Sequence, residues 1–218
     1  MPQGFHGDLA QVGGTLVTMA KAARETMRQA SQALLAADHT SAQQVIERGA
    51  EINVLFRLVE DRVYDLVGRR KLGPDELPAT MTAVQVAADL ERMSELAVHV
   101  ARSSLRRHPA PAVAPELTGL FTTMSEVADR LAEKMVDVLA DHDAELAAGL
   151  DQDDDAMDQL HRRLFAVMLS PDWPLGVEAA VDGALLGRFY ERYADHAVNV
   201  ANRVVELTRA DNGIRSSN

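Results

Sequence analysis

The sequence has 218 residues, a formal net charge of −11 and no cysteine. Because the surface is acidic, we expect no direct nucleic-acid partner and no basic patch that binds anionic lipid. The absence of cysteine excludes a disulfide, a thiolate nucleophile and a cysteine-ligated zinc site, and the low aromatic content of 4% favours helices packed on helices over sheets.

Apolar residues at helical spacing fill the first part of the chain. Over residues 8–38 they recur every three or four positions, which predicts a helix with one buried face. A second amphipathic helix is predicted to begin at a cap, Thr40 or Ser41, and to run to about Arg70.

A Leu-Gly-Pro break at 72–74 separates the second helix from a third. We expect Asp75 or Thr80 to cap the third helix, which ends near Arg107. Three prolines in the seven residues 109–115 cannot continue a helix, so this segment is predicted to be a semi-rigid linker.

The second half of the chain repeats this plan. Amphipathic patterns over 117–138 and 146–167 predict a fourth and a fifth helix. In the turn that follows, Pro174 suits the first position of a helix, and Trp173 is predicted to close the end of a bundle. The sixth helix ends near Arg209.

One motif occurs twice, one hundred residues apart, in the third and the sixth helix. Segments 91–101 and 191–201 share Glu, Arg, Ala, Val, Val and Ala at matched positions, which an internal duplication explains. The sequence therefore predicts an all-α fold of two tandem, pseudo-symmetric three-helix bundles. The two bundles are expected to comprise residues 1–108 and 116–218, and the linker 109–115 joins them.

Each motif copy places two acids on one face of its helix. Glu91 and Glu95 are four residues apart, and so are Glu191 and Asp195. Like charges at this spacing repel, so we expect a cation, an arginine or a water network to lie over each pair.

Another acidic pair lies on the predicted fifth helix. Asp154 and Asp158 flank the apolar Met157, so they can line a groove that faces the sixth helix. Oxygen ligands from two helices suit Fe, Mn, Mg or Ca better than a soft-ligand zinc site. Pairs with this spacing, such as Glu47 and Glu51, also occur elsewhere, and for most of them a solvated helix face is the simpler interpretation.

An enzymatic or storage function of the ferritin type is the alternative hypothesis. Asp158 and His161 superficially match the Glu-x-x-His element of di-iron bundles, but such a centre needs two of these elements and two further glutamates. The sequence also lacks a Gly-rich phosphate loop, a Ser/His/Asp order and a nucleotide fingerprint, so we expect no enzyme and no organic cofactor. A third possibility is a helical module whose acids only increase solubility.

The chain resembles the PhoU family, which regulates bacterial phosphate uptake and signalling. The resemblance extends over nearly the whole chain, and residues 89–95 and 190–201, with the pattern Glu-Arg-x-x-Asp-x-Ala-x-Asn, carry it most strongly. Segments 155–161 and 185–189, together with Trp173, are similar to the actinobacterial PhoY-type branch.

This resemblance implies a cytoplasmic, non-enzymatic protein that forms a homodimer. It implies that the protein couples a phosphate ABC transporter ATPase to a sensor histidine kinase and represses signalling when phosphate is plentiful. Since no uninterrupted apolar run reaches membrane-spanning length, we expect the protein to approach a membrane only through its partners.

The resemblance also implies metal binding, with the ion open among Fe, Mn, Mg and Zn. The metal-motif residues carried over by position are Glu91, Glu95, Asp154, Asp158, Glu191 and Asp195. The family's acidic pair on the second helix falls at Gly49 and Asn53, neither of which has a carboxylate. We therefore expect the second half to bind metal more tightly than the first.

Overall fold

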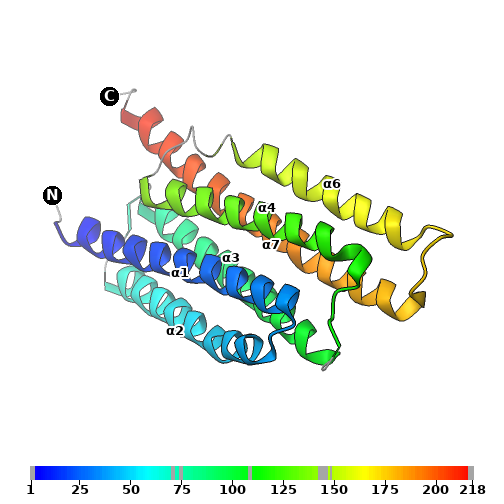
Figure 1. Ribbon diagram of the computed structural model, residues 1–218. Helices are drawn as coiled ribbons and strands as arrows, with labels where there is room; N and C mark the ends of the chain where they lie inside the picture. Colours follow the sequence, from blue (N-terminus) through cyan, green and yellow to red (C-terminus); the bar gives the residue numbers. More distant parts are fainter. Residues whose placement is uncertain are drawn as a thin grey trace.

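The computed structural model describes residues 3–69, 72–73, 76–107, 110–141, 147 and 149–215, with side chains described within 7–206. These residues form six helices and no strand, which confirms the all-α prediction (Figure 1). The helices are α1 (Gln3–Ala36), α2 (His39–Arg69), α3 (Glu76–Arg106), α4 (Pro115–Asp141), α6 (Leu150–Met168) and α7 (Gly176–Arg215). None of the described helices combines the length and the apolar content that a membrane span requires.

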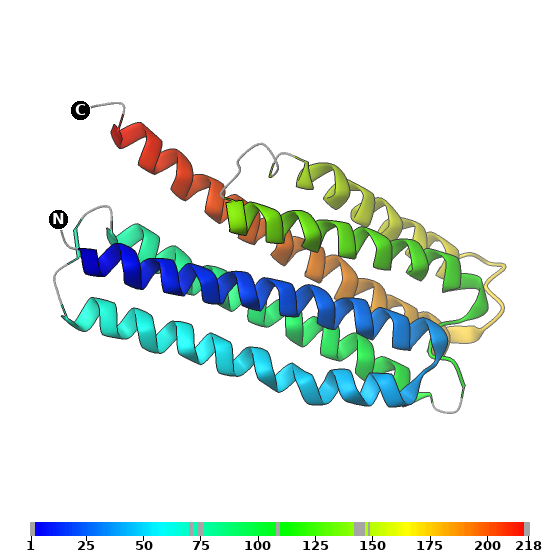
Figure 2. The ribbon, with the colours of Figure 1, turned by 60° about the vertical axis from the view of Figure 1, so that its left-hand side comes forward.

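Two sets of three helices lie side by side. Helices α1, α2 and α3 contact one another, and so do α4, α6 and α7. Between the sets, α1 packs against α4 and α3 packs against α7. In the described part of the chain, α2 and α6 contact only helices of their own set, so they form the two outer edges of the molecule (Figures 1 and 2).

The turn between α1 and α2 shows which residue caps the second helix. The carboxylate of Asp38 accepts hydrogen bonds from the backbone N–H groups of Thr40 and Ser41, each at 3.1 Å, and from the Ser41 hydroxyl at 2.6 Å. The prediction that Thr40 or Ser41 is the cap was therefore wrong. Ala37, with φ of 50°, reverses the chain one residue earlier, which places Asp38 at the free N–H groups.

The start of α3 also differs from the prediction. The hydroxyl of Thr80 donates to the Glu76 carbonyl oxygen at 2.7 Å from inside the helix, so Thr80 is not a cap. Instead, the Glu76 carboxylate accepts a hydrogen bond from the backbone N–H of Gly73 at 2.8 Å. The other predicted cap, Asp75, lies outside the described residues.

The last helix begins two residues later than Pro174, the predicted first position. Helix α7 starts at Gly176, whose φ of 73° suits glycine. The indole N–H of Trp173 donates to the Gly176 carbonyl oxygen at 2.8 Å, and the Trp173 ring packs against the apolar core. This hydrogen bond, rather than a proline at the first helical position, holds the turn.

Aromatic side chains of α7 join the two bundles into one core. Tyr190 and Tyr193 are fully buried. The Tyr190 hydroxyl donates to the Ser31 hydroxyl of α1 at 2.7 Å, and the Tyr190 ring packs against Phe121 of α4 with centroids 6.0 Å apart. The Tyr193 hydroxyl donates to the Ala23 carbonyl oxygen at 3.3 Å. Because these side chains of α7 contact α1, the two bundles share one hydrophobic core.

An ion pair reinforces the contact between α1 and α4. The Arg24 guanidinium donates to both carboxylate oxygens of Asp129, at 2.8 and 3.0 Å. The hydrogen bond from Arg24 lowers the pKa of Asp129 below its ordinary value, although partial burial opposes this shift. The pair therefore stabilises the contact while Asp129 is ionised.

Replacing Asp129 with asparagine is expected to lower the free energy of unfolding by about 1 kcal/mol near neutral pH, since the pair is partly exposed. The folded-state pKa is lowered, so this contribution is present above the ordinary pKa of the carboxyl and is lost as pH falls through the lowered value. Urea denaturation as a function of pH measures it. Asp137→Asn, at an exposed position of the same helix, serves as the control, and an equal loss for both variants would contradict the assignment.

Candidate metal-binding surface

The six predicted acidic residues lie on three helices and form two surfaces. We call Asp154 and Asp158 of α6 with Glu191 and Asp195 of α7 the C-terminal carboxylate surface. Glu91 and Glu95 of α3 form the N-terminal carboxylate surface. In the described part of the chain α6 contacts α7 but not α3, so the two surfaces do not share a helix pair.

The four carboxylates of the C-terminal surface interact electrostatically. Burial raises the pKa of Asp154, and the charges of Asp195 and Asp158 raise it further. Burial and the charge of Asp195 likewise raise the pKa of Glu191, while Arg188 and His161 oppose the shift. The structure therefore brings α6 and α7 carboxylates close enough to repel one another, an arrangement that a bound cation would stabilise.

One of these carboxylates already has a cationic partner. An Arg188 guanidinium nitrogen donates to both oxygens of Glu191 at 2.5 Å. The Glu191 side chain is 15% exposed and that of Arg188 is 52% exposed, so the arginine is the more accessible member of the pair. This local pair, three residues apart on α7, balances one of the four charges.

Two glycines of α7 set the distance between α6 and α7. A Cβ atom at Gly187 would lie 2.4 Å from Leu164 Cδ2, and one at Gly183 would lie 2.7 Å from Met168 Sδ. Neither helix could approach so closely with a larger residue at these positions. Gly187 lies one turn before Glu191, so this close contact is next to the acidic side chains of α7.

His161 of α6 lies close to this surface, a position that the sequence analysis did not predict. Its Nε2 atom is buried and has no hydrogen-bond partner among the described residues. Its ring lies beside Gly187, 3.2 Å from where a Cβ atom at that position would be, and it opposes the rise in the pKa of Glu191. The spacing of three residues from Asp158 was the sequence signal.

The two carboxylate surfaces differ in how well their residues fit a metal ion. In the described chain, no group of three or more acidic or histidine side chains is close enough to hold one ion. The C-terminal surface nevertheless has a suitable donor set, because it offers four repelling carboxylates and an unpartnered imidazole nitrogen. Binding there would require side-chain rotations, including release of Glu191 from Arg188.

The N-terminal surface fits a metal ion less well. Burial raises the pKa of Glu91, as do the charges of Glu95 and Glu60. Glu95 pairs with Arg92. A Cβ atom at Gly49 would lie 2.5 Å from Val98 Cγ2, so the packing of α2 on α3 leaves no room for an acid at that position. Glu60 of α2 is a nearby acid that the sequence analysis did not name.

Hydrogen bonds between polar side chains join α3 and α7, the two helices that carry the repeated motif. Asp89 of α3 accepts from Nε of Arg203 at 3.1 Å, and its other oxygen lies 2.9 Å from Nδ1 of His196. Arg203 also donates to Gln85 at 2.6 Å. His196 therefore lies at the interface between the bundles, with a side chain 13% exposed. Asp89 lies two residues before Glu91, and His196 directly follows Asp195, so their contact joins α3 to α7 beside one acid of each carboxylate surface.

Replacing Gly187 with alanine is expected to lower the free energy of unfolding by about 1–3 kcal/mol, because Leu164 is fully buried and cannot move away from the new methyl group. Gly119→Ala is the matched control, since nothing lies within 4 Å of its added Cβ. That control should raise the stability by about 0.5–1 kcal/mol. Chemical denaturation compares the two variants, and effects of the same sign would refute the close approach of α6 and α7.

Comparison with known proteins gives consistent matches over most of the chain. The PhoU domain matches residues 16–104 and 121–204. The phosphate-specific transport system accessory protein PhoU homolog 2 of Mycobacterium tuberculosis is 42% identical over 94% of this chain and 96% of its own length. PhoU homolog 1 of Mycobacterium leprae is 40% identical over 94% of this chain and 92% of its own length.

Solved structures match the fold. The crystal structure of PhoU from Pseudomonas aeruginosa has a TM-score of 0.84 and 25% identity, covering 94% of this chain and 99% of that chain. The phosphate transport system regulatory protein PhoU from Streptococcus pneumoniae has a TM-score of 0.80 at 20% identity, covering 94% of this chain and 96% of that chain. At that identity the second likeness concerns the fold alone.

Proposed function

Because this chain belongs to the PhoU family, we propose that it is an accessory regulator of phosphate transport without enzymatic activity of its own. The observation that carries this proposal is the extent of the similarity to relatives named as accessory proteins of the phosphate-specific transport system. It reaches 42% identity over nearly the full length of both chains.

In finer detail, the protein couples a phosphate ABC transporter ATPase to a sensor histidine kinase in the cytoplasm and represses the kinase when phosphate is plentiful. It acts as a homodimer. The support for an adaptor of this kind is the family relationship together with the two outer helices, α2 and α6, which contact only their own bundles within the described chain. Their outward faces are available to protein partners.

A metal ion is part of this proposal, held by the C-terminal carboxylate surface. The ion would balance the mutual repulsion of Asp154, Asp158, Glu191 and Asp195 and so link α6 to α7. Its contribution is structural: it supplies positive charge and several coordination positions to hard oxygen ligands. The support is the raised pKa of Asp154 and of Glu191, caused first by burial and then by neighbouring carboxylates.

An affinity purification from cells grown with plentiful phosphate and from starved cells tests the adaptor function. We expect the transporter ATPase and a sensor histidine kinase to co-purify with the tagged chain, and the recovery of the kinase to change with phosphate supply. The control bait is an unrelated helical protein of similar negative charge. If neither partner is enriched over that control, the coupling role is wrong.

A further inference from the structure

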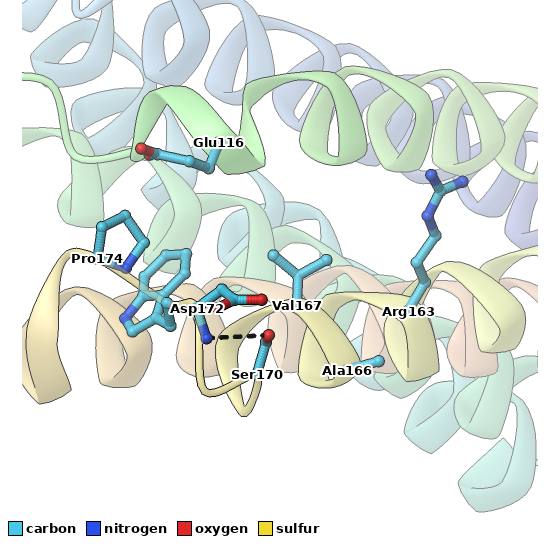
Figure 3. Close-up of a pocket in the computed structure, with 8 residues that line it drawn as sticks. Glu116, Arg163, Ala166, Val167, Ser170, Asp172 and Pro174 are labelled. Atoms are coloured by element: carbon cyan, nitrogen blue, oxygen red, sulfur yellow. Dashed lines mark hydrogen bonds between the residues drawn. The ribbon is translucent and has the colours of Figure 1, made fainter.

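A pocket of about 380 Å³ opens where the start of α4 faces the end of α6 and the turn into α7 (Figure 3). Val167, Trp173 and Pro174 supply apolar lining. Glu116 extends from the first turn of α4, across the pocket from Asp172 in the turn. The pocket extends to the tip of the hairpin formed by α6 and α7, and its lining includes none of the six acids of the carboxylate surfaces.

Two negative charges lie at the end of the pocket that the turn between α6 and α7 forms. Neither carboxylate, that of Glu116 or that of Asp172, has a hydrogen-bond or ion-pair partner among the described residues. The one cation of the lining, Arg163, extends toward α4 at the opposite end, beyond Val167 (Figure 3). The turn end therefore offers two carboxylates to a cation, while the far end repels one.

Exposed apolar side chains surround the same hairpin tip. Leu169 is 77% exposed, Val177 is 79% exposed and Leu175 is 40% exposed. A contiguous apolar patch is typical of a surface that a partner covers, and these three residues lie within nine positions of the chain. The turn between α2 and α3, its counterpart in the duplication, has no tryptophan, since Trp173 is the single tryptophan of the chain.

We propose that this Trp173 pocket is a docking site for an arginine side chain of a partner protein, flanked in that partner by large apolar residues. A guanidinium group is attracted to an indole ring and donates several hydrogen bonds in a plane, so Trp173, Glu116 and Asp172 are complementary to it. The apolar flanks of the partner cover Leu169 and Val177. The acidic character of the chain, with net charge −11, favours the approach of such a basic segment. This site goes beyond the proposed function, since it does not depend on which protein carries the arginine.

Because Trp173 is the single tryptophan, its fluorescence reports directly on the pocket. The probe is the peptide acetyl-Leu-Leu-Arg-Leu-Leu-amide, titrated into the full chain. Two matched peptides carry citrulline or glutamate in place of arginine. We expect a saturable change in Trp173 fluorescence with the arginine peptide, and binding of the citrulline and glutamate peptides that is weaker by about tenfold or more.

Variants of the pocket complete the test. Glu116→Gln and Asp172→Asn are each expected to weaken binding of the arginine peptide by about fivefold to tenfold. The control is Glu126→Gln, an exposed acid on α4 that lies ten residues, or about 15 Å, along the helix from Glu116. The proposal is overturned if no saturable change occurs, if arginine and citrulline peptides bind equally, or if Glu126→Gln weakens binding as much as Glu116→Gln.

Discussion

Replacing Tyr190 with alanine is expected to lower the free energy of unfolding by about 3–5 kcal/mol. The side chain is fully buried on α7, packs against Phe121 of α4 and donates its hydroxyl hydrogen bond to Ser31 of α1. Its removal leaves a cavity between the two bundles. The closely packed side chains of the three helices cannot move far enough to fill it. Urea denaturation followed by circular dichroism measures the loss.

Two further variants separate the contributions to this effect. Tyr190→Phe keeps the ring but leaves the buried Ser31 hydroxyl without its partner, so it should cost about 1 kcal/mol. Tyr64→Ala removes a tyrosine that is 76% exposed, and it should change the stability by less than about 0.5 kcal/mol. If Tyr190→Ala costs no more than Tyr64→Ala, the two bundles do not share a core.

Replacing Asp195 with asparagine is expected to weaken the binding of Mn(II) by about tenfold or more. The substitution keeps the shape of the side chain but removes one of the four charges of the C-terminal carboxylate surface. Glu95→Gln should leave the tighter site unchanged, because Glu95 lies on the other surface, where Gly49 and Asn53 supply no carboxylate. Calorimetric titration of Mn(II) into metal-free protein measures both affinities.

The control for this pair is Glu51→Gln, which removes an exposed acid of α2 from a pair with the same spacing of four residues. It should not change the affinity. The asymmetry is contradicted if Glu95→Gln abolishes the tighter site while Asp195→Asn preserves it. A uniform loss in all three variants would show that Mn(II) responds only to net charge.

The helices were predictable because their signal is local and repeated. Apolar residues return at each turn over 8–38 and again over 117–138, and such a period specifies a buried helix face whatever packs against it. The duplication was predictable from segments 91–101 and 191–201 alone. The ends of the helices were less predictable, because Asp38, Thr40 and Ser41 are all residue types that cap helices. Only the fold shows that Asp38 accepts the backbone N–H groups of the other two.

The contacts between distant residues could not be predicted in this way. Tyr190 and Ser31 are 159 positions apart, and nothing in either local pattern indicates that they meet. The close approach at Gly187 also depends on which helix lies opposite. The sequence does not show which side chain of another helix would collide with a Cβ atom at that position. For the candidate site, the sequence indicated which acids share a helix face. It did not indicate that Arg188 pairs with Glu191 or that His161 lies beside them.

The most direct test of the proposed function is the expression of a phosphate-regulon reporter in a strain that lacks every PhoU-family gene, with and without this chain. In phosphate-rich medium we expect high expression without the chain and a several-fold decrease when the chain is supplied at the level of the native protein. Equally high expression in both strains, with the chain present in the soluble fraction of the cell extract, would contradict the proposed regulatory function.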